Sequence, residues 1–315
     1  MMTKRRAFLA NVTVFAAATI VWPAGRALAA TRSFDFSPEQ RGRLRAPRNP
    51  AVVRLLSNGY RPVEAGVLTV AVAPFAAPLA TYATDARTIV GSDPDYALLV
   101  ADALGLKLEF VPVAWADWPL GLTSGKYDAV ISNVGVTEQR KEKFDFSTYR
   151  LGLHAFYVPV ASSIQSIRIP KDIAGLRIIT GSGTIQERIL LEWNNQNVAQ
   201  GLKAATLQYF DDLDSASLAL LSNRADATFN PHAPLAYAAA TQGKIRLVGT
   251  VNAGWPLRAD VAIASRKGSG LAQALTEATN GLIAGGQYQA ALARWGLETE
   301  AIERSDTNPP GYKDT

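Results

Sequence analysis

The stretch from Gly125 to Tyr149 constrains the fold more than any other part of this 315-residue chain, because it joins a buried strand to a polar helix start. It reads GKYDAVISNVGVTEQRKEKFDFSTY. The apolar run from Asp128 to Ser132 is typical of a strand that is covered on both faces in a parallel sheet. Thr137 then stands at an N-cap position ahead of the polar run from Glu138 to Lys143. The stretch therefore predicts an α/β fold.

Arg140 lies three residues after this N-cap, so its guanidinium and the N–H groups of the first helical turn can face the same point. A planar guanidinium binds two oxygens at once, and a helix start favours negative charge. We therefore interpret this helix start as a carboxylate site. The alternative is a solvated arginine between Lys141 and Lys143.

Further motifs occur in a fixed order on both sides of this stretch. They are LGLKLEFVPVAW before it and DIAGLRIITGSGT, NRADATF, VAIASRKGSG and GGQYQAALARWGL after it. Together they resemble the bacterial periplasmic amino-acid-binding proteins that serve ABC transporters, the solute-binding proteins of family 3. The resemblance runs from about Val67 to Leu297. It implies a type II periplasmic binding fold with two lobes, each a mostly parallel sheet flanked by helices, joined by a two-strand hinge.

The N-terminus predicts an export signal at residues 1–29. Lys4, Arg5 and Arg6 precede the apolar run from Phe8 to Trp22, and the sequence Ala-Leu-Ala ends at Ala29. A cleaved signal peptide and a periplasmic location follow, and Arg5-Arg6 favours the twin-arginine route over general secretion. The alternative is a membrane anchor, for which a run of fifteen residues is short.

Charge and cysteine content then exclude several classes of function. Residues 1–29 hold four basic residues and no acid, so 28 basic residues stand against 27 acidic ones in the remainder. Such a balance, without a basic run, gives no reason to expect nucleic-acid binding. Because the chain has no cysteine, disulfides, thiol chemistry and a lipid-modified cysteine are excluded.

Strand and helix patterns alternate from Val67 onward, which predicts parallel pairs with right-handed crossovers. The sequence predicts a discontinuous first lobe from residues 67–157 and 258–299 and a second lobe from residues 158–257. Residues 30–66, rich in arginine and proline, are expected to form an extension outside the main fold, with one helical turn at Ala51–Leu56. Residues 300–315 are expected to be an irregular tail. Two extended crossings between the lobes would make a hinge and a cleft that can close.

The resemblance assigns ligand-binding roles in the first lobe. Arg140 matches the arginine that holds the ligand carboxylate, and Ser132 and Gly135 match neighbouring polar contacts, although glycine retains only a backbone donor. Trp115 matches an aromatic wall, and Phe75 is a candidate for a second one. Core packing is the alternative for Trp115, and a strand-end role is the alternative for Ser132.

In the second lobe, Gly183 and Thr184 resemble the Gly-Thr turn whose helix-start N–H groups bind the carboxylate from the other side. An ordinary turn is the alternative. The family commonly holds the ligand ammonium with an aspartate five positions after Asp226, but Pro231 stands there, beside Asn230. Asn230 is therefore a ligand candidate without charge.

We expect a binding protein that captures a small carboxylate, an amino acid, by closing its cleft, and delivers it to an inner-membrane ABC permease. No catalytic or metal-binding residues are predicted, because His154 and His232 are the only histidines and no metal-spaced cluster occurs. We further expect a monomer that needs no cofactor. Two alternatives share this fold: a periplasmic enzyme similar to cyclohexadienyl dehydratase, and a ligand sensor that acts through a membrane receptor.

Overall fold

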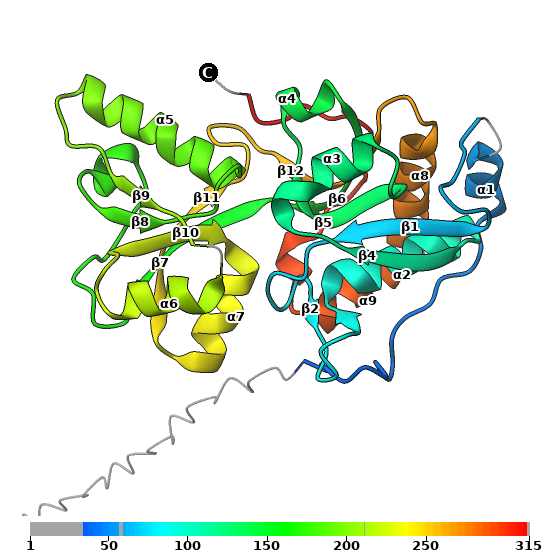
Figure 1. Ribbon diagram of the computed structural model, residues 1–315, viewed down its shortest axis with the longest axis horizontal. Helices are drawn as coiled ribbons and strands as arrows, with labels where there is room; N and C mark the ends of the chain where they lie inside the picture. Colours follow the sequence, from blue (N-terminus) through cyan, green and yellow to red (C-terminus); the bar gives the residue numbers. More distant parts are fainter. Residues whose placement is uncertain (1–33, 57–58, 211, 314–315) are drawn as a thin grey trace, which may run out of the picture. The chain divides into compact units, whose positions relative to one another are not determined.

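The computed structural model describes residues 34–56, 59–210 and 212–313, which form two lobes, each built on its own five-stranded sheet (Figure 1). The predicted signal at residues 1–29 lies outside the described residues. Within these ranges, no helix combines the length and the apolar character needed to cross a lipid bilayer.

The sheet of the first lobe has the strand order β4-β1-β5-β12-β6. Its strands are β1 (Val67–Val72), β4 (Lys107–Pro112), β5 (Ala129–Gly135), β6 (Phe144–Leu151) and β12 (Asp260–Arg266). β1 pairs in parallel with β4 and β5, whereas β12 is antiparallel to β5 and β6. This sheet is therefore mixed rather than mostly parallel, because β12 returns from the second lobe in the opposite direction.

Helices cover both faces of this sheet. The first-lobe helices are α1 (Pro50–Leu56), α2 (Ser92–Leu104), α3 (Trp118–Thr123), α4 (Glu138–Lys141), α8 (Leu271–Ala284) and α9 (Gln287–Arg294), with the short strands β2 (Thr81–Tyr82) and β3 (Ile89–Val90) and the 3₁₀ turns η1 (Trp115–Asp117) and η3 (Glu298–Glu300). Leu68 and Val70 of β1 pack in one cluster with α2 and α8, whereas Ala71 packs in another with Trp118 and Leu122 of α3. All six residues of β1 are buried as a result.

The sheet of the second lobe has the order β11-β7-β10-β8-β9. Its elements are β7 (Leu153–Pro159), η2 (Pro170–Ile173), β8 (Arg177–Ile179), α5 (Ile185–Ala199), β9 (Thr206–Gln208), α6 (Leu213–Leu221), β10 (Ala227–Pro231), α7 (His232–Gln242) and β11 (Ile245–Asn252). β10 is parallel to β8 but antiparallel to β7, so this sheet is also mixed. Its core is aromatic: Phe156 stacks on Phe229 at 4.1 Å between ring centroids and on Trp193 at 5.7 Å.

The chain passes between the lobes at two adjoining places. Gly152 separates β6 from β7, and residues 253–259 lead from β11 to β12. The Ala253 N–H donates to the Gly152 carbonyl at 3.1 Å. A Cβ on Gly152 would lie 2.5 Å from Ala253 Cβ and 2.6 Å from the Ala259 carbonyl oxygen, so the crossings touch backbone to backbone. Because all of β7 belongs to the second sheet, the first crossing comes several residues before the predicted boundary at residue 157.

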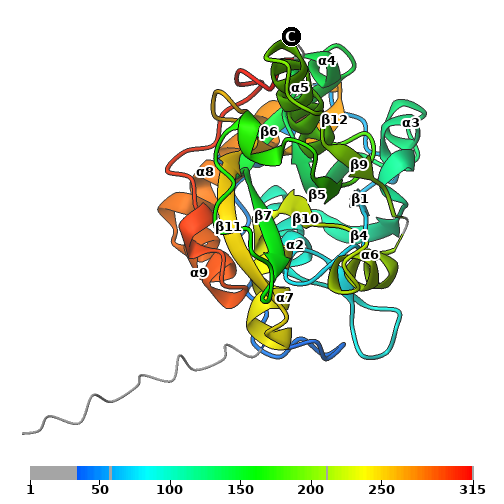
Figure 2. The same cartoon turned by 90° about the vertical axis from the view of Figure 1, so that its left-hand side faces the viewer.

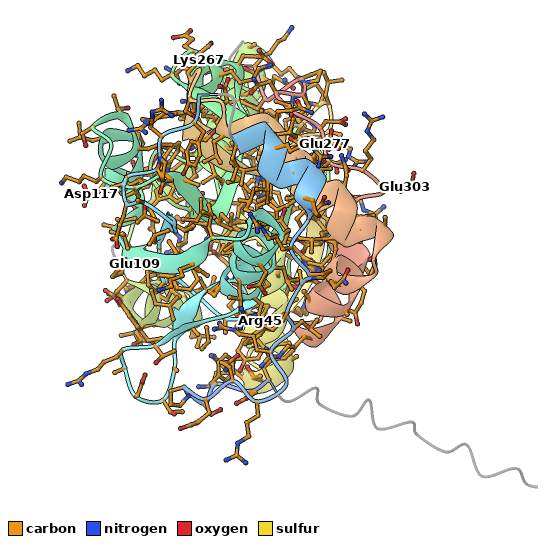
Figure 3. The ribbon with its side chains drawn as sticks, turned by 90° about the vertical axis from the view of Figure 1, so that its right-hand side faces the viewer. Arg45, Glu109, Asp117, Lys267, Glu277 and Glu303 are labelled. Atoms are coloured by element: carbon orange, nitrogen blue, oxygen red, sulfur yellow. The ribbon has the colours of Figure 1, made fainter. Side chains whose placement is uncertain are left out.

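The terminal segments differ from the prediction. Residues 34–56 are not an extension outside the main fold: Phe34, Phe36 and Leu44 pack against the first-lobe core, and Val52 of α1 is part of it. The predicted turn at residues 51–56 is found as α1. Residues 301–313 lack helix and strand, as expected, but Tyr312 is only 5% exposed. Ion pairs explain why polar composition misled the prediction, since Arg43 binds Asp95 and Arg45, labelled in Figure 3, binds Asp102 of the first lobe.

Candidate functional site

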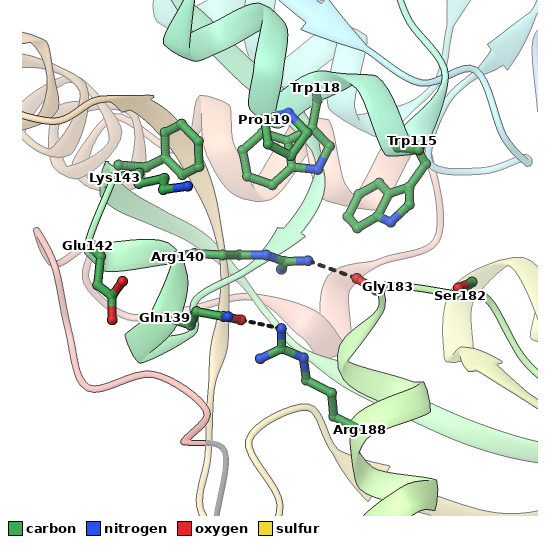
Figure 4. Close-up of a pocket in the computed structure, with 12 residues that line it drawn as sticks. Trp115, Trp118, Pro119, Gln139, Arg140, Glu142, Lys143, Ser182, Gly183 and Arg188 are labelled. Atoms are coloured by element: carbon green, nitrogen blue, oxygen red, sulfur yellow. Dashed lines mark hydrogen bonds between the residues drawn. The ribbon is translucent and has the colours of Figure 1, made fainter.

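Arg140 lies where the two lobes meet (Figure 4). Thr137 caps α4, because its hydroxyl accepts a hydrogen bond from the Arg140 N–H at 3.0 Å, which places Arg140 in the first turn as predicted. The guanidinium donates from Nη1 to the Gly135 carbonyl at 2.9 Å and from Nη2 to the Gly183 carbonyl of the second lobe at 3.4 Å. The Arg140 guanidinium therefore already contacts both lobes.

Two indole rings flank this guanidinium. Its Cζ lies 5.6 Å from the ring centroid of Trp115 and 5.5 Å from that of Trp118, within range of cation–π attraction. Trp118 is buried against Phe144 and fixes the position of Trp115, whose ring it meets edge to face. Sequence reasoning missed Trp118, although its spacing of three residues from Trp115 places both rings on one helical turn.

A cavity of about 460 Å³ opens beside Arg140. Its lining is Trp115, Ala116, Trp118, Pro119, Gln139, Arg140, Glu142, Lys143 and Phe144 from the first lobe and Ser182, Gly183 and Arg188 from the second. Three of these side chains are cationic and one is anionic, so the cavity favours an anionic ligand. A hydrogen bond from Arg188 to the Gln139 side chain crosses between the lobes at its edge (Figure 4).

Ser132 and Gly135 lie on β5 but do not line this cavity, and Gly135 contacts Arg140 through its carbonyl. The Ser132 hydroxyl accepts a hydrogen bond from the Ala73 N–H at 2.9 Å and so ties β5 to the end of β1. A Cβ on Gly135 would lie 2.4 Å from the Cδ1 atom of Ile185, the first residue of α5. The space next to Gly135 is therefore filled by an apolar side chain from the opposite lobe.

Gly183 and Thr184 form the turn into α5, as the sequence predicted. Gly183 has φ +66°, which favours glycine, and its carbonyl is the group that contacts Arg140. The Thr184 hydroxyl caps the helix by accepting from the Glu187 N–H at 3.2 Å. The Glu187 carboxylate in turn accepts from the Gly183 N–H at 2.6 Å. A negative charge of the protein itself thus lies at this helix start.

Asn230 and Phe75 are not among the residues that line the cavity. The side-chain amide of Asn230 donates a hydrogen bond to the Thr228 hydroxyl at 2.9 Å, and both residues lie on the same face of β10. Phe75 is 53% exposed in the loop after β1. The structure therefore brings together Arg140, Trp115 and Gly183 of the predicted set, with Gly135 and Thr184 adjoining them, whereas Ser132, Asn230 and Phe75 are not part of this group.

A buried polar cluster, which sequence reasoning missed, lies at the end of β5. The Tyr149 hydroxyl donates to Asp93 Oδ1 at 2.8 Å and accepts from the Asn133 N–H at 3.3 Å. Arg150 binds both the Asn133 side chain and the Glu300 carboxylate. Burial raises the pKa of Asp93, and the charge of Arg150 partly opposes this shift. Asn133 has φ +53°, a strained backbone conformation that often accompanies a functional site.

The histidines lie in the second lobe, where β7 meets β10 and α7. His154 on β7 pairs with Pro231 across the sheet, and burial lowers its pKa to about 3. Burial also lowers the pKa of His232, the first residue of α7. In the described ranges, no group of three or more histidine, aspartate or glutamate side chains is arranged to hold a metal ion.

The fold and the position of the cavity define the class of protein. Two α/β lobes, a double crossing and an anion-favouring cavity between them are the features of a two-lobed type II periplasmic binding protein. The chain belongs to the bacterial extracellular solute-binding proteins, family 3, because the family model matches residues 68–298.

Individual relatives support this assignment. The arginine-binding protein ArgT of Corynebacterium glutamicum is 28% identical over 250 residues, which are 78% of this chain and 79% of that protein. The L-cystine-binding protein TcyJ of Escherichia coli (strain K12) is 28% identical over 236 residues, 74% of this chain and 83% of that protein. Among solved structures, an ancestral arginine-binding protein bound to arginine is 28% identical, with a TM-score of 0.63, and the match covers 73% of this chain and 98% of that one. The predicted family and two-lobed fold are thus confirmed.

Proposed function

We propose that this protein is the solute-binding component of an ABC transporter, which captures an amino acid in the periplasm and delivers it to an inner-membrane permease. Family membership supports a binding role, and the relatives ArgT and TcyJ are named for binding arginine and L-cystine. The mechanism is ligand-linked closure, in which a ligand that contacts both lobes favours the arrangement where they meet.

The position of Arg140 is the observation that carries this proposal. Its guanidinium lies at the junction of the lobes, held by two main-chain carbonyls and two indole rings, beside a cavity with an excess of cationic side chains. A guanidinium held in one orientation can bind both oxygens of a carboxylate. We therefore assign the ligand carboxylate to Arg140, and the flat wall beside it to Trp115.

The ammonium group of an amino acid needs a different partner. Pro231 stands where the family resemblance places an aspartate, and the Asn230 side chain carries no charge. An ammonium that is desolvated against amide and carbonyl groups alone would cost more than one paired with a carboxylate. The ligand is thus an amino acid whose ammonium is held in another way, or a small organic acid without one.

A melting screen against amino acids and organic acids tests the binding function, because a bound ligand stabilises the folded state. We expect Arg140→Ala to weaken binding of the best ligand by ~2–5 kcal/mol, the scale for truncating one partner of a buried charged pair. Arg140→Lys should restore little, since the fork geometry is lost. Arg87→Ala, which removes an exposed first-lobe arginine, is the matched control and should leave the affinity unchanged.

Near-native affinity in Arg140→Ala would show that the carboxylate is held elsewhere. Calorimetry with the best ligand and its deaminated analogue then separates the two ligand types. Equal affinities would indicate an organic acid, whereas a loss of ~2 kcal/mol or more for the analogue would indicate an ammonium partner. Prephenate belongs in the same screen, because its turnover would favour the enzyme alternative.

A further inference from the structure

Both described terminal segments of the chain lie outside the part that matches the family, and each contacts both lobes. The N-terminal one is residues 34–49, and the C-terminal one is residues 306–313; the family match covers residues 68–298. In Figures 1 and 2 the first lies beside α7, and the second runs beside α4 and α5. They therefore reach the junction of the lobes from opposite sides.

The N-terminal segment is fixed on the first lobe by charge. Asp95 of α2, which is only 2% exposed, accepts from Arg43 at 2.6 Å, from Arg294 at 2.8 Å and from the Trp295 indole at 2.8 Å. The Phe36 carbonyl accepts from the Thr84 N–H at 2.9 Å. These contacts hold the backbone next to α9.

Two aromatic side chains of this anchored segment contact the second lobe. Phe34 stacks on Tyr237 of α7 at 5.3 Å between centroids, with an interplanar angle of 24°, and meets Trp295 of the first lobe at 5.4 Å. Phe36 repeats the arrangement, at 6.2 Å from Tyr237 and 5.9 Å from Trp295. Each phenylalanine thus lies between an aromatic ring of one lobe and an aromatic ring of the other.

The C-terminal segment is likewise anchored on the first lobe and places an aromatic ring against the second. Its backbone pairs with the first lobe, because the Tyr312 N–H donates to the Val136 carbonyl at 3.0 Å and the Tyr312 carbonyl accepts from Glu138 at 2.9 Å. A Cβ on Gly311 would lie 2.9 Å from the Thr137 Cα, so the two backbones are in close contact. The Tyr312 ring, however, belongs to the hydrophobic core of the second lobe, which contains Phe156 and Trp193.

We propose that Phe34, Phe36 and Tyr312 are clasps: positioning residues that hold the second lobe against the first and so set how readily the cleft opens. Each clasp is anchored on the first lobe and contacts the second lobe only while the lobes are together, which adds to the population of the closed form. Its effect on ligand exchange rests on the proposed binding function, but its effect on the distance between the lobes does not.

Distance measurement between spin labels tests the clasps directly. Because the chain has no cysteine, Leu120→Cys in α3 and Leu218→Cys in α6 provide unique labelling sites, which are 75% and 60% exposed in the native protein. In this background, Phe34→Ala/Phe36→Ala and Tyr312→Leu should lengthen and broaden the distance distribution. Val198→Ala, which removes an exposed apolar side chain of α5, should not.

Ligand kinetics provide the second readout. An aromatic contact of this kind changes an equilibrium constant by about two- to tenfold, so the dissociation rate of a bound amino acid should rise by about that factor in each clasp variant. A double-mutant cycle of Phe34→Ala and Tyr237→Ala should show that the two effects are not additive, because the rings contact each other.

An unchanged distance distribution in both clasp variants would overturn the proposal, even if their melting temperatures fall, because loss of packing alone lowers stability without separating the lobes. Longer distances with unchanged ligand kinetics would also overturn the assigned role in exchange. If the wild-type protein binds no amino acid or organic acid, the proposed function fails, but the distance measurement still decides whether the clasps exist.

Discussion

Replacing Glu300 by glutamine tests the buried ion pair that joins η3 to the first-lobe sheet. Glu300 lies in η3, and its carboxylate binds Arg150 of β6; their side chains are only 4% and 3% exposed. Glu300→Gln keeps the shape but removes the negative charge, which leaves a buried guanidinium without its anion. Breaking a buried pair in this way costs about 3–5 kcal/mol, because the remaining charge is desolvated without compensation.

The lower end of this range applies here, since glutamine can still accept one hydrogen bond and Arg150 keeps its contact with Asn133. We therefore expect the free energy of unfolding to fall by about 3 kcal/mol. For a chain of this size the melting temperature should fall by about 6–12 °C. Urea denaturation followed by circular dichroism would give the first value, and calorimetry the second.

Two controls separate the buried charge from other effects. Arg304→Ala breaks an exposed pair, with side chains 78% and 59% exposed, and should cost at most about 1 kcal/mol. The double variant Arg150→Met/Glu300→Met should regain most of the stability lost in Glu300→Gln, because both charges are gone. If Glu300→Gln costs no more than Arg304→Ala, the reasoning from burial is refuted.

Three further predictions follow from single residues. Burial lowers the pKa of His154 to about 3, so between pH 6.5 and 3 the imidazole is protonated in the unfolded chain but neutral in the folded one. The contribution of neutral His154 to stability is therefore complete above pH 6.5 and is lost as the pH falls. Lowering the pH from 7 to 5 should therefore destabilise the wild type by about 2 kcal/mol more than His154→Phe in urea denaturation, and equal losses would contradict the assignment. Gly152→Ala should lower the melting temperature, because its Cβ would clash with Ala253 and the Ala259 carbonyl; unchanged melting would contradict this close packing of the crossings. Glu187→Gln should raise the affinity for a carboxylate about two- to fivefold, as measured by calorimetry.

Most of the fold could be predicted because alternation and helix-stop glycines are local signals. The apolar run at residues 68–73 predicts a strand, and the structure has β1 at Val67–Val72. Gly105 predicts a helix end, and α2 ends before it, with a φ of +70° at Gly105 that makes the left-handed C-cap. Strand β6 was not predicted: Phe144–Leu151 is a strand only because β12 returns from the second lobe to pair with it. A pairing between residues more than 100 positions apart leaves no local trace in the sequence.

The candidate site could likewise be predicted only where the signal lies among residues that are neighbours in sequence. Local chemistry identified Arg140, since its N-cap and helix start are neighbours in sequence, and the structure places it at the junction of the lobes. The spacing of Trp118 from Trp115 is a local signal, but the cluster around Arg150 could not be found in this way, because its partners come from other elements of the fold. The terminal segments were misread for a related reason. An arginine-rich segment resembles a solvated one until buried acids such as Asp95 are known to face it.

Glu187 decides how much the second lobe contributes to anion binding. A helix start normally offers free N–H groups and a partial positive charge to a ligand, and the turn at Gly183 was predicted to do so. Here the Glu187 carboxylate accepts from the Gly183 N–H and also receives a hydrogen bond from Tyr209; burial and this carboxylate raise the pKa of Tyr209 to about 12. The partial positive charge at the start of α5 is therefore offset by Glu187, and we expect a ligand carboxylate to bind chiefly to Arg140 of the first lobe. Glu187→Gln removes the negative charge that offsets the partial positive charge of the helix start, which is why affinity should rise. A fall would show that Glu187 itself holds the ligand, as an ammonium partner would.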